Sequence, residues 1–370
     1  MARPARLMDG LHRLRRMFLG RTGEPAGVLL VSAGGLGDTI LFSVVASRFA
    51  SLAKPGEAVT ALFRHDGAKT AFCLPPGIQI DTVDFGRFDR EPGYRWETLE
   101  RLFQANYRLV ISTDFLRHPY LDEAMIAAAN APDCYAMQAR PWPKYDAALA
   151  ANRRFYSDLF DSGPAVVDKV VRWNAFANWL LDADEPPPKV HLDAERLAGP
   201  AIPSDQDEII VQPFSAVAAK QPDAEIFLAL ADALAGRMRL RITGLQSDLD
   251  KNPEFEKLVE KQNVEFDSSS FSEICAKVVT AKLVVSVDTA FMHLAAALGA
   301  PTLCLASAAY VGEIVPYDDR VRPKNVDFLY QEMPCQGCLG DCVHPLEAGR
   351  FRCIAALTQE RIVEAVLSRL

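Results

Sequence analysis

The sequence predicts an α/β protein made of two parallel-sheet domains. Short apolar, β-branched runs, which are typical of buried strands, alternate with helical segments along the chain. The alternation is interrupted at 184–188, where three consecutive prolines predict a stiff, extended linker. The 370 residues suffice for two domains of ordinary size. Alternating strands and helices on both sides of a linker therefore predict two parallel sheets.

The first half of the chain shows this alternation from residue 28 onwards. The apolar runs predict strands at 28–32, 58–63, 80–85 and 108–113. Helical spacing predicts helices at 39–52, 96–105, 121–130 and 166–182. A proline- and aromatic-rich loop is expected at 140–145.

The second half repeats the pattern. Strands are expected at 208–212, 239–243, 264–266, 283–287 and 302–305, and helices at 224–236, 253–262 and 271–280. The helix at 224–236 has Asp223 as its N-cap and Gly236 as its end. Residues 289–312 carry no charge and are long enough to span a membrane, but Gly299 and Pro301 divide them. A buried βαβ element without a transmembrane span is therefore predicted.

Charge and composition exclude some classes of function. The net charge is -8, which argues against binding of nucleic acid by the protein as a whole. The N-terminus holds arginines but no continuous apolar core, so no secretory signal is expected and the cytoplasm is the expected location. In that reducing compartment a disulfide framework is not expected.

The segment 1–25 is predicted to be basic and amphipathic. Its first 21 residues hold six arginines and one aspartate. One helical face collects the apolar side chains Leu7, Leu11, Leu14, Met17 and Phe18. Such helices lie on anionic membrane surfaces, where each basic residue contributes about 1 kcal/mol. Peripheral attachment to the inner membrane is one interpretation; a helix packed on its own domain, or a frayed terminus, is the other.

The strand at 28–32 runs into a glycine-rich turn. Gly34, Gly35 and Gly37 precede Asp38 and Thr39, where the next helix begins. The carboxylate of Asp38 is therefore presented at the carboxyl end of a strand, where open α/β sheets hold ligands. The turn lacks the lysine of a P-loop, and Ile40 replaces the third small residue of a dinucleotide fingerprint. The alternative is that Asp38 only caps the helix.

Three places in the second half could contact a nucleotide. Lys220 ends a small-residue loop after the strand at 208–212, as suits a phosphate. Asp288 and Thr289 follow the strand at 283–287, where the amides of Thr289 and Ala290 could hold a diphosphate. His293 lies one turn further, and Asp248 after another strand could bind ribose hydroxyls. The alternatives are a solvated lysine, a turn aspartate and a structural histidine.

Four of the eight cysteines lie close together near the C-terminus. Cys335, Cys338, Cys342 and Cys353 have a spacing typical of metal ligands, and thiolates suit a structural zinc or iron ion. Reduced, packed thiols are the alternative. The other four cysteines stand in apolar surroundings and are expected to be inert core residues.

Taken in order, these motifs resemble glycosyltransferase family 9, the ADP-heptose:lipopolysaccharide heptosyltransferases. The family's opening motif, a strand followed by G-x-x-G-D, is matched by 34–38, and its lysine loop by 220–227. Its most diagnostic signature, D-[ST]-x-x-x-H-L-A-A-A-L-G-x-P-T, is matched by 288–302. The resemblance extends from about residue 28 to the C-terminus.

This resemblance implies a GT-B fold, with two Rossmann-like domains facing a central cleft. The acceptor would bind the domain at 26–188 and the nucleotide-sugar the domain at 189–334, with the cysteine cluster and a last helix at 335–370. The reaction would be an inverting transfer of heptose from ADP-heptose to a lipid-linked lipopolysaccharide inner-core acceptor at the inner membrane leaflet. No cofactor is expected for catalysis.

The resemblance also implies a role for each site residue. Asp38 would be the catalytic base, beside the acceptor-side loop of Gly34, Gly35, Gly37 and Thr39. Lys220 and the amides of Thr289 and Ala290 would hold the diphosphate. Asp288 would contact the sugar, Asp248 the nucleoside, and His293 belongs to the same donor signature. Arg64, Arg117 and Arg140 are candidate contacts to acidic sugars.

The sequence departs from the family after the signature. Residues 306–309 read ASAA where the family has Phe-Gly-Pro-Thr, and Pro222 replaces a tryptophan. Two other functions therefore stay open. One is a related transferase that uses another nucleotide-sugar for a different surface glycan or a protein. The other is a degenerate nucleotide-binding or assembly protein.

Overall fold

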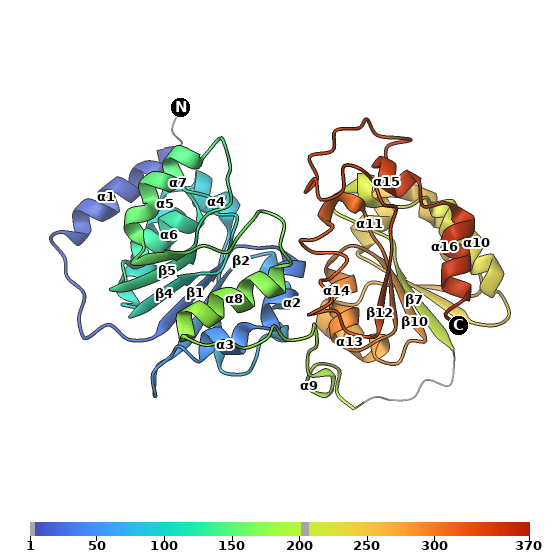
Figure 1. Ribbon diagram of the computed structural model, residues 1–370, viewed down its shortest axis with the longest axis horizontal. Coiled ribbons are helices and arrows are strands. Elements are labelled where there is room, and N and C mark those ends of the chain that lie inside the picture. Colours follow the sequence, from blue (N-terminus) through green and yellow to red (C-terminus); the bar gives the residue numbers. More distant parts are fainter. Residues whose placement is uncertain (1–3, 201–206) are drawn as a thin grey trace. The chain divides into compact units, whose positions relative to one another are not determined.

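The computed structural model describes residues 4–200 and 207–370 (Figure 1). The chain forms two compact units. Unit 1 comprises Met1–Ala165 and Arg172–Pro186, and unit 2 comprises Val166–Val171 and Pro187–Leu370. The domain limits predicted at 25/26, 188/189 and 334/335 stay predictions.

Unit 1 is built on one parallel six-stranded sheet in the order β3-β2-β1-β4-β5-β6. Its strands are β1 (Val28–Ser32), β2 (Val59–Arg64), β3 (Ile78–Val83), β4 (Leu109–Ser112), β5 (Asp133–Met137) and β6 (Asp158–Phe160). Its helices are α1 (Leu7–Arg16), α2 (Leu36–Ser43), α3 (Ala46–Ala50), α4 (Phe85–Arg90), α5 (Pro92–Gln104), α6 (Asp122–Ala129), α7 (Asp146–Asn152) and most of α8 (Lys169–Leu181). The central strands β1 and β4 are buried throughout, because helices cover both faces of the sheet.

Unit 2 is built on a second parallel six-stranded sheet, in the order β12-β11-β10-β7-β8-β9. Its strands are β7 (Glu208–Gln212), β8 (Arg239–Thr243), β9 (Val264–Asp267), β10 (Leu283–Val287), β11 (Thr302–Leu305) and β12 (Val326–Leu329). Its helices include α9 (Ala194–Ala198), α10 (Ala224–Leu234), α11 (Gln246–Lys251), α12 (Glu256–Val259), α13 (Phe271–Val278), α14 (Ala290–Ala297), α15 (Arg352–Ala355) and α16 (Gln359–Leu367). The predicted α/β class with two parallel sheets is confirmed.

The uncharged segment at 289–312 forms a βαβ element, as predicted. Helix α14 connects β10 to β11, and the two strands pair in parallel, with Val284 opposite Thr302. In the described part of the chain, no helix combines the length and the apolar character that crossing a membrane would need.

Several elements differ from the sequence-based expectation. The predicted helix at 39–52 starts earlier, at Leu36, and is divided into α2 and α3. The division follows Ser43, whose hydroxyl donates to the Thr39 carbonyl and competes with the helical bonds, and two β-branched valines come next. Strands β5, β6 and β12 were not predicted from the sequence.

The two sheets share one topology, which locates their ligand sites. In each, the strand order reverses between two central strands: β1 and β4 in unit 1, and β7 and β10 in unit 2. Open α/β sheets bind ligands outside the carboxyl ends of the strands at this point. The turns after these four strands are therefore the expected ligand-binding sites.

Candidate functional site

In unit 1, Asp38 is the third residue of α2, directly after the glycine turn. The Gly35 amide donates a hydrogen bond of 2.9 Å to Asp38 Oδ2, which is one half of a capping box. The side chain of Asp38 is only partly buried. The helix-capping interpretation is thus present in the structure, and a role as base stays a prediction.

The turn around Asp38 needs its glycine for steric reasons. A Cβ added at Gly34 would lie 2.5 Å from Asp38 Cβ and 2.9 Å from its Oδ2, too close for any side chain to be tolerated without movement. Thr39 is buried and donates its hydroxyl to the Gly35 carbonyl at 3.2 Å. Gly34 and Thr39 therefore fix the position of the carboxylate on the helix.

Two further residues lie at this turn: Asp114, which sequence reasoning missed, and Arg64, whose expected contact with acidic sugars stays a prediction. Asp114 follows β4, and its Oδ2 accepts a hydrogen bond from the Ala33 amide. The Arg64 guanidinium at the end of β2 is 3.7 Å from a Cβ built at Gly35. Asp114 resembles Asp38 in being an acid in the turn that follows a central strand, and could have been found by that rule.

The expectation that Arg117 contacts acidic sugars is wrong. Arg117 is 2% exposed, and its Nε donates to Glu123 Oε1 at 3.0 Å. The hydroxyl of Tyr156 donates to the same oxygen at 3.0 Å. Because both charges are buried and paired within the core of unit 1, Arg117 serves structure and is not accessible to a ligand.

In unit 2, the structure brings Lys220 and Asp288 together. Lys220 Nζ donates to the backbone carbonyl of Asp288 at 3.0 Å and forms an ion pair with its carboxylate. The ammonium also lies 4.8 Å from the centre of the Tyr310 ring. The residue is 8% exposed, so the predicted alternative of a solvated surface lysine is wrong.

Ser307 completes the surroundings of Asp288. Its hydroxyl donates to Asp288 Oδ2 at 2.9 Å, and Ser307 belongs to the ASAA run that departs from the family pattern. Burial raises the pKa of Asp288 above its ordinary value, and Lys220 and Ser307 offset part of the rise. A buried carboxylate is thus held in place by one cation and one hydroxyl.

The N-terminus of α14 lies directly after Asp288. Thr289 is its N-cap, but the Thr289 hydroxyl does not cap the helix and donates instead to Gln212 Oε1 at 2.9 Å. The Thr289 amide donates to the Val287 carbonyl at 2.8 Å, so the amides from Ala290 onwards are the ones that open the helix. Gln212, at the end of β7, was missed by sequence reasoning and fixes the Thr289 side chain.

Asp248 makes the same kind of helix-capping hydrogen bond as Asp38. It is the third residue of α11, and the Leu245 amide donates to its Oδ2 at 2.9 Å. It is partly exposed and follows β8, one strand away from β7. His293 is different: it is 4% exposed, and its Nδ1 lies 2.6 Å from the Tyr317 hydroxyl in the core. Their roles in donor binding stay predictions.

The four clustered cysteines line one small cavity. Cys335, Cys338 and Cys342 are half-buried, Cys353 is buried, all four are free thiols, and His344 lines the same cavity. Within residues 4–200 and 207–370, no three His, Cys, Asp or Glu side chains are arranged so that they could hold a metal ion. Elsewhere, burial raises the pKa of Cys134 to about 12 and of Cys275 to about 11, as befits inert core thiols.

Comparison with known proteins gives a consistent result. The model of the family described as glycosyltransferase family 9 (heptosyltransferase) matches residues 129–341. The fold is similar to that of the E. coli heptosyltransferase WaaC, solved with ADP-2-deoxy-2-fluoro heptose (18% identity, 95% of this chain and 100% of that chain, TM-score 0.67). It is also similar to a family 9 glycosyltransferase from Veillonella parvula (17%, 94% and 97%, TM-score 0.68). A third similar structure is the E. coli ADP-heptose lps heptosyltransferase II (13%, 93% and 98%, TM-score 0.67).

A dodecameric, iron-containing glycosyltransferase, TibC from enterotoxigenic E. coli, has a similar fold as well (14% identity, 95% of this chain and 77% of that chain, TM-score 0.53). The search of curated proteins gave no match to the sequence. At these identities the likeness to solved structures concerns the fold, and the match to the family model concerns the sequence itself.

Proposed function

Because the chain belongs to glycosyltransferase family 9 (heptosyltransferase), we propose that this glycosyltransferase moves heptose from ADP-heptose to a lipopolysaccharide inner-core acceptor, with inversion at the transferred carbon. The observation that carries the proposal is the buried Lys220–Asp288 pair beside the N-terminus of α14. A cation and unpaired helix amides at the point where the strand order reverses suit the diphosphate of a nucleotide-sugar.

On the donor side, the proposal gives each residue a chemical task. Lys220 and the first amides of α14 stabilise the negative charge that grows on the departing diphosphate. Asp288 accepts hydrogen bonds from hydroxyls of the sugar, and Lys220 offsets part of the cost of burying its carboxylate. Asp248 takes the ribose hydroxyls. These groups are proposed to act without a metal ion.

On the acceptor side, Asp38 is the proposed base. Its carboxylate takes the proton of the acceptor hydroxyl while that oxygen forms a bond to the anomeric carbon of the sugar. The bond from this carbon to the diphosphate breaks at the same time, and ADP leaves with the electron pair. One base and one stabilised leaving group are what a single inverting displacement requires.

The identity of the nucleotide-sugar donor distinguishes this heptosyltransferase function from that of a related transferase with another donor. We expect ADP-heptose to be turned over, with release of ADP, when a lipid-linked inner-core saccharide is the acceptor. Matched titrations with UDP- and GDP-sugars are the control. Turnover of one of those sugars instead would overturn the proposal in favour of a transferase for another surface glycan or a protein. The contact between Ser307 and Asp288, in the loop that departs from the family, is the observation that favours this second candidate.

A structural zinc or iron ion is proposed for the cysteine cluster. Four thiols and one imidazole line the same cavity, and this donor chemistry suits either metal. Because no three of these side chains already surround a common point in the described residues, the ligands would have to move together to bind the ion. The ion would hold the segment after β12 against the rest of unit 2. We expect metal analysis of protein purified under reducing conditions to find zinc or iron bound, and Cys338→Ser to lower both the metal content and Tm. If the purified wild type contains no metal and Cys338→Ser has the same Tm as the wild type, the cluster consists of packed thiols.

A further inference from the structure

Helix α1 is attached to unit 1 by its polar side chains. Asp9 accepts two hydrogen bonds, of 2.6 and 2.7 Å, from the buried guanidinium of Arg95 on α5. His12 is 2% exposed and packs edge-on against Trp96 and Phe103. A surface helix usually does the reverse and buries its apolar face against the protein.

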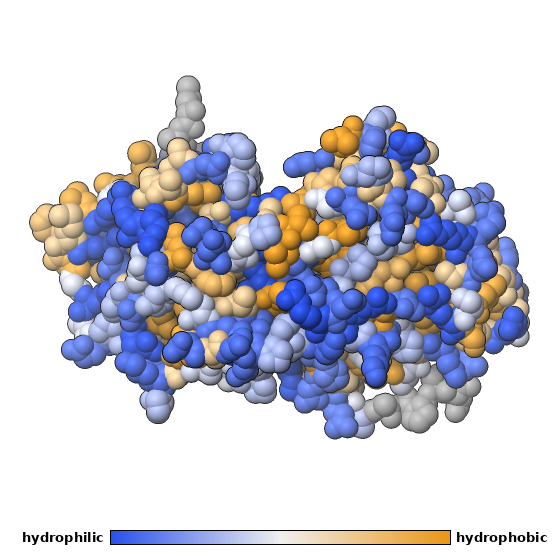
Figure 2. Space-filling view, viewed as in Figure 1, coloured by the Kyte–Doolittle hydropathy of each residue, from blue (hydrophilic) through white to orange (hydrophobic). Residues whose placement is uncertain are grey.

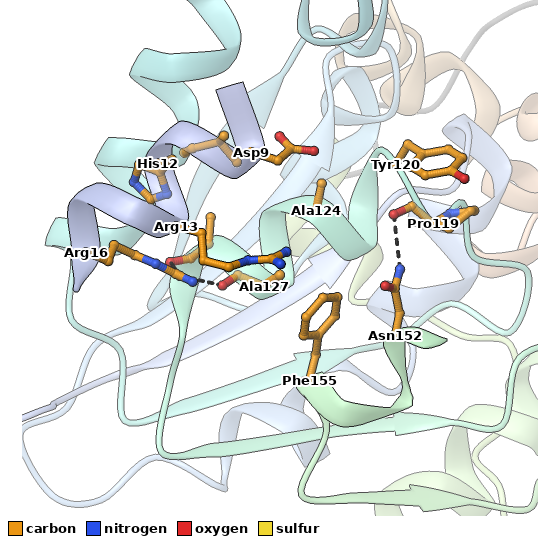
Figure 3. Close-up of a pocket in the computed structure, with 12 residues that line it drawn as sticks. Asp9, His12, Arg13, Arg16, Pro119, Tyr120, Ala124, Ala127, Asn152 and Phe155 are labelled. Carbon is orange, nitrogen blue, oxygen red and sulfur yellow. Dashed lines mark hydrogen bonds between the residues drawn. The ribbon is translucent and has the colours of Figure 1, made fainter. Parts of the chain in front are cut away.

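Arginines fix this orientation from the C-terminal end of the helix. Arg16 donates to the carbonyls of Ala127 and Ala128 at 2.6 and 3.0 Å, and Figure 3 shows it reaching Ala127. Arg21 donates to the carbonyls of Ala129 and Asn130, both at 2.9 Å. These carbonyls lie at the end of α6, where no further helical turn satisfies them. The polar attachment is therefore extensive.

As a result, the apolar side of α1 is left uncovered. The outward stripe consists of Leu7, Leu11, Leu14 and Phe18, which expose 65%, 52%, 54% and 78% of their surface. Leu7, Leu11 and Leu14 share one face of α1, and Phe18 extends the stripe in the turn that follows the end of the helix at Arg16. In Figure 1 the helix lies on the outside of unit 1, and Figure 2 shows apolar surface in that region. Large apolar side chains in a continuous exposed stripe mark an interaction surface.

The charge beside the outward stripe is positive, although the whole chain carries -8. Residues 4–21 hold five arginines and one aspartate, and that aspartate is paired with Arg95. Arg6 and Arg15 pair with Asp89 and Glu100. The other three, Arg13, Arg16 and Arg21, form no ion pair with a carboxylate of the described residues.

Two of these arginines line one cavity. Arg13 and Arg16 contribute to a hollow of about 170 Å³ that is also lined by Asn152, Phe155 and Asp9, whose carboxylate is paired with Arg95 (Figure 3). Burial and the like charge of Arg13 lower the pKa of Arg16, so the two guanidinium groups repel each other. An anionic group between them, such as a phosphate, would relieve this repulsion.

We propose that the outward stripe and Arg13 dock unit 1 on an anionic lipid surface. The stripe inserts between the lipids at the level of the headgroups, and the exposed Arg13 contacts lipid phosphates. The biological role of this docking rests on the proposed function: a protein bound to the lipid surface would meet a lipid-linked acceptor there. Binding to lipid is nevertheless a property of α1 alone and can be measured without any sugar donor.

Sedimentation of the full chain with lipid vesicles tests the proposal. We expect binding to phosphatidylcholine vesicles that contain phosphatidylglycerol, and weaker binding to phosphatidylcholine alone. Leu14→Ser combined with Phe18→Ser should lower the affinity at least about 100-fold, since two large apolar side chains no longer enter the lipid. Arg13→Gln should lower the affinity for the anionic vesicles about fivefold and leave the neutral ones unchanged.

A matched control comes from the other end of the chain. Leu367→Ser combined with Leu370→Ser removes two exposed leucines from unit 2 and should leave vesicle binding unchanged. Equal vesicle binding by the wild type and by the Leu14→Ser/Phe18→Ser variant (the α1 variant) would overturn the proposal. The proposal would also be overturned if the wild type did not bind vesicles but self-associated while the α1 variant was monomeric. In that case a second copy of the chain would cover the stripe.

The two proposals can fail separately. Release of ADP with a water-soluble, delipidated acceptor should be the same in the α1 variant and the wild type. Vesicle binding without turnover of any nucleotide-sugar would leave the docking surface standing and remove the proposed function. Turnover without vesicle binding would do the opposite.

Discussion

Asp38→Asn is expected to lower kcat about 10²–10⁴-fold while the protein stays folded. The amide has nearly the shape of the carboxylate, and its oxygen can still accept the Gly35 hydrogen bond that caps α2. It cannot take up a proton from the acceptor. The substitution therefore separates the two interpretations of Asp38, because a residue that only caps the helix would tolerate it. The measurement is kcat at saturating donor and acceptor, together with the thermal unfolding midpoint.

Two further variants test the position of the Asp38 carboxylate and control for the loss of a helix cap. Gly34→Ala adds a methyl group 2.5 Å from Asp38 Cβ, so it should displace the carboxylate and lower kcat without removing the acid. Glu273→Gln makes the same kind of change in the capping box of α13, at Ser270, and should leave kcat unchanged. If Asp38→Asn keeps full activity, the base must be another residue, and Asp114 at the same turn is the next to test.

Lys220→Met is expected to weaken ADP binding about 10²-fold and to destabilise the protein by about 3–5 kcal/mol. The loss of binding follows from removing the cation that the diphosphate would meet. The loss of stability follows because the carboxylate of Asp288 remains buried without its partner. Calorimetric titration with ADP and denaturant unfolding measure the two effects independently.

A double variant distinguishes structure from binding at this pair. Lys220→Met combined with Asp288→Asn removes both charges, so most of the lost stability should return while ADP binding stays weak. Lys261→Met is the matched control: its ion pair with Asp232 lies at the surface, with the carboxylate exposed, and its loss should cost less than about 1 kcal/mol. If ADP binds the double variant as tightly as the wild type, Lys220 is a structural residue and the diphosphate lies elsewhere.

Much of the fold was readable because buried parallel strands leave a local signal. β1, β7 and β10 have apolar, β-branched centres bounded by turn residues, and each was predicted with the bounds it has in the structure. β5, β6 and β12 were missed for equally local reasons. β5 starts at an aspartate, β6 has three residues, and β12 alternates with an acid, so their neighbours in the sheet stabilise them more than their own sequence does.

The site could be predicted in part. The rule that acids and small residues after central strands mark a ligand site indicated the turns at Asp38 and Asp288. It did not show that Lys220 would reach Asp288, because the two residues lie far apart in sequence and the ion pair forms only when β7 and β10 pair. Gln212 and Ser307 were missed for the same reason. Polar side chains are common near strand ends, and the importance of these two follows only from their hydrogen bonds to Thr289 and Asp288.

The sequence alone determined the α/β class, the two parallel sheets and the family, because these depend on short-range periodicity and on contiguous motifs. The tertiary structure decided which face of each element is buried. The pattern of α1 predicted an amphipathic helix correctly, yet its polar face is the one packed against unit 1, since Arg95 and Glu100 supply partners for Asp9 and Arg15. Arg117 is likewise a core residue only because Glu123 lies buried beside it. A local pattern states what a segment can bury, and the groups that fold against it determine what it does bury.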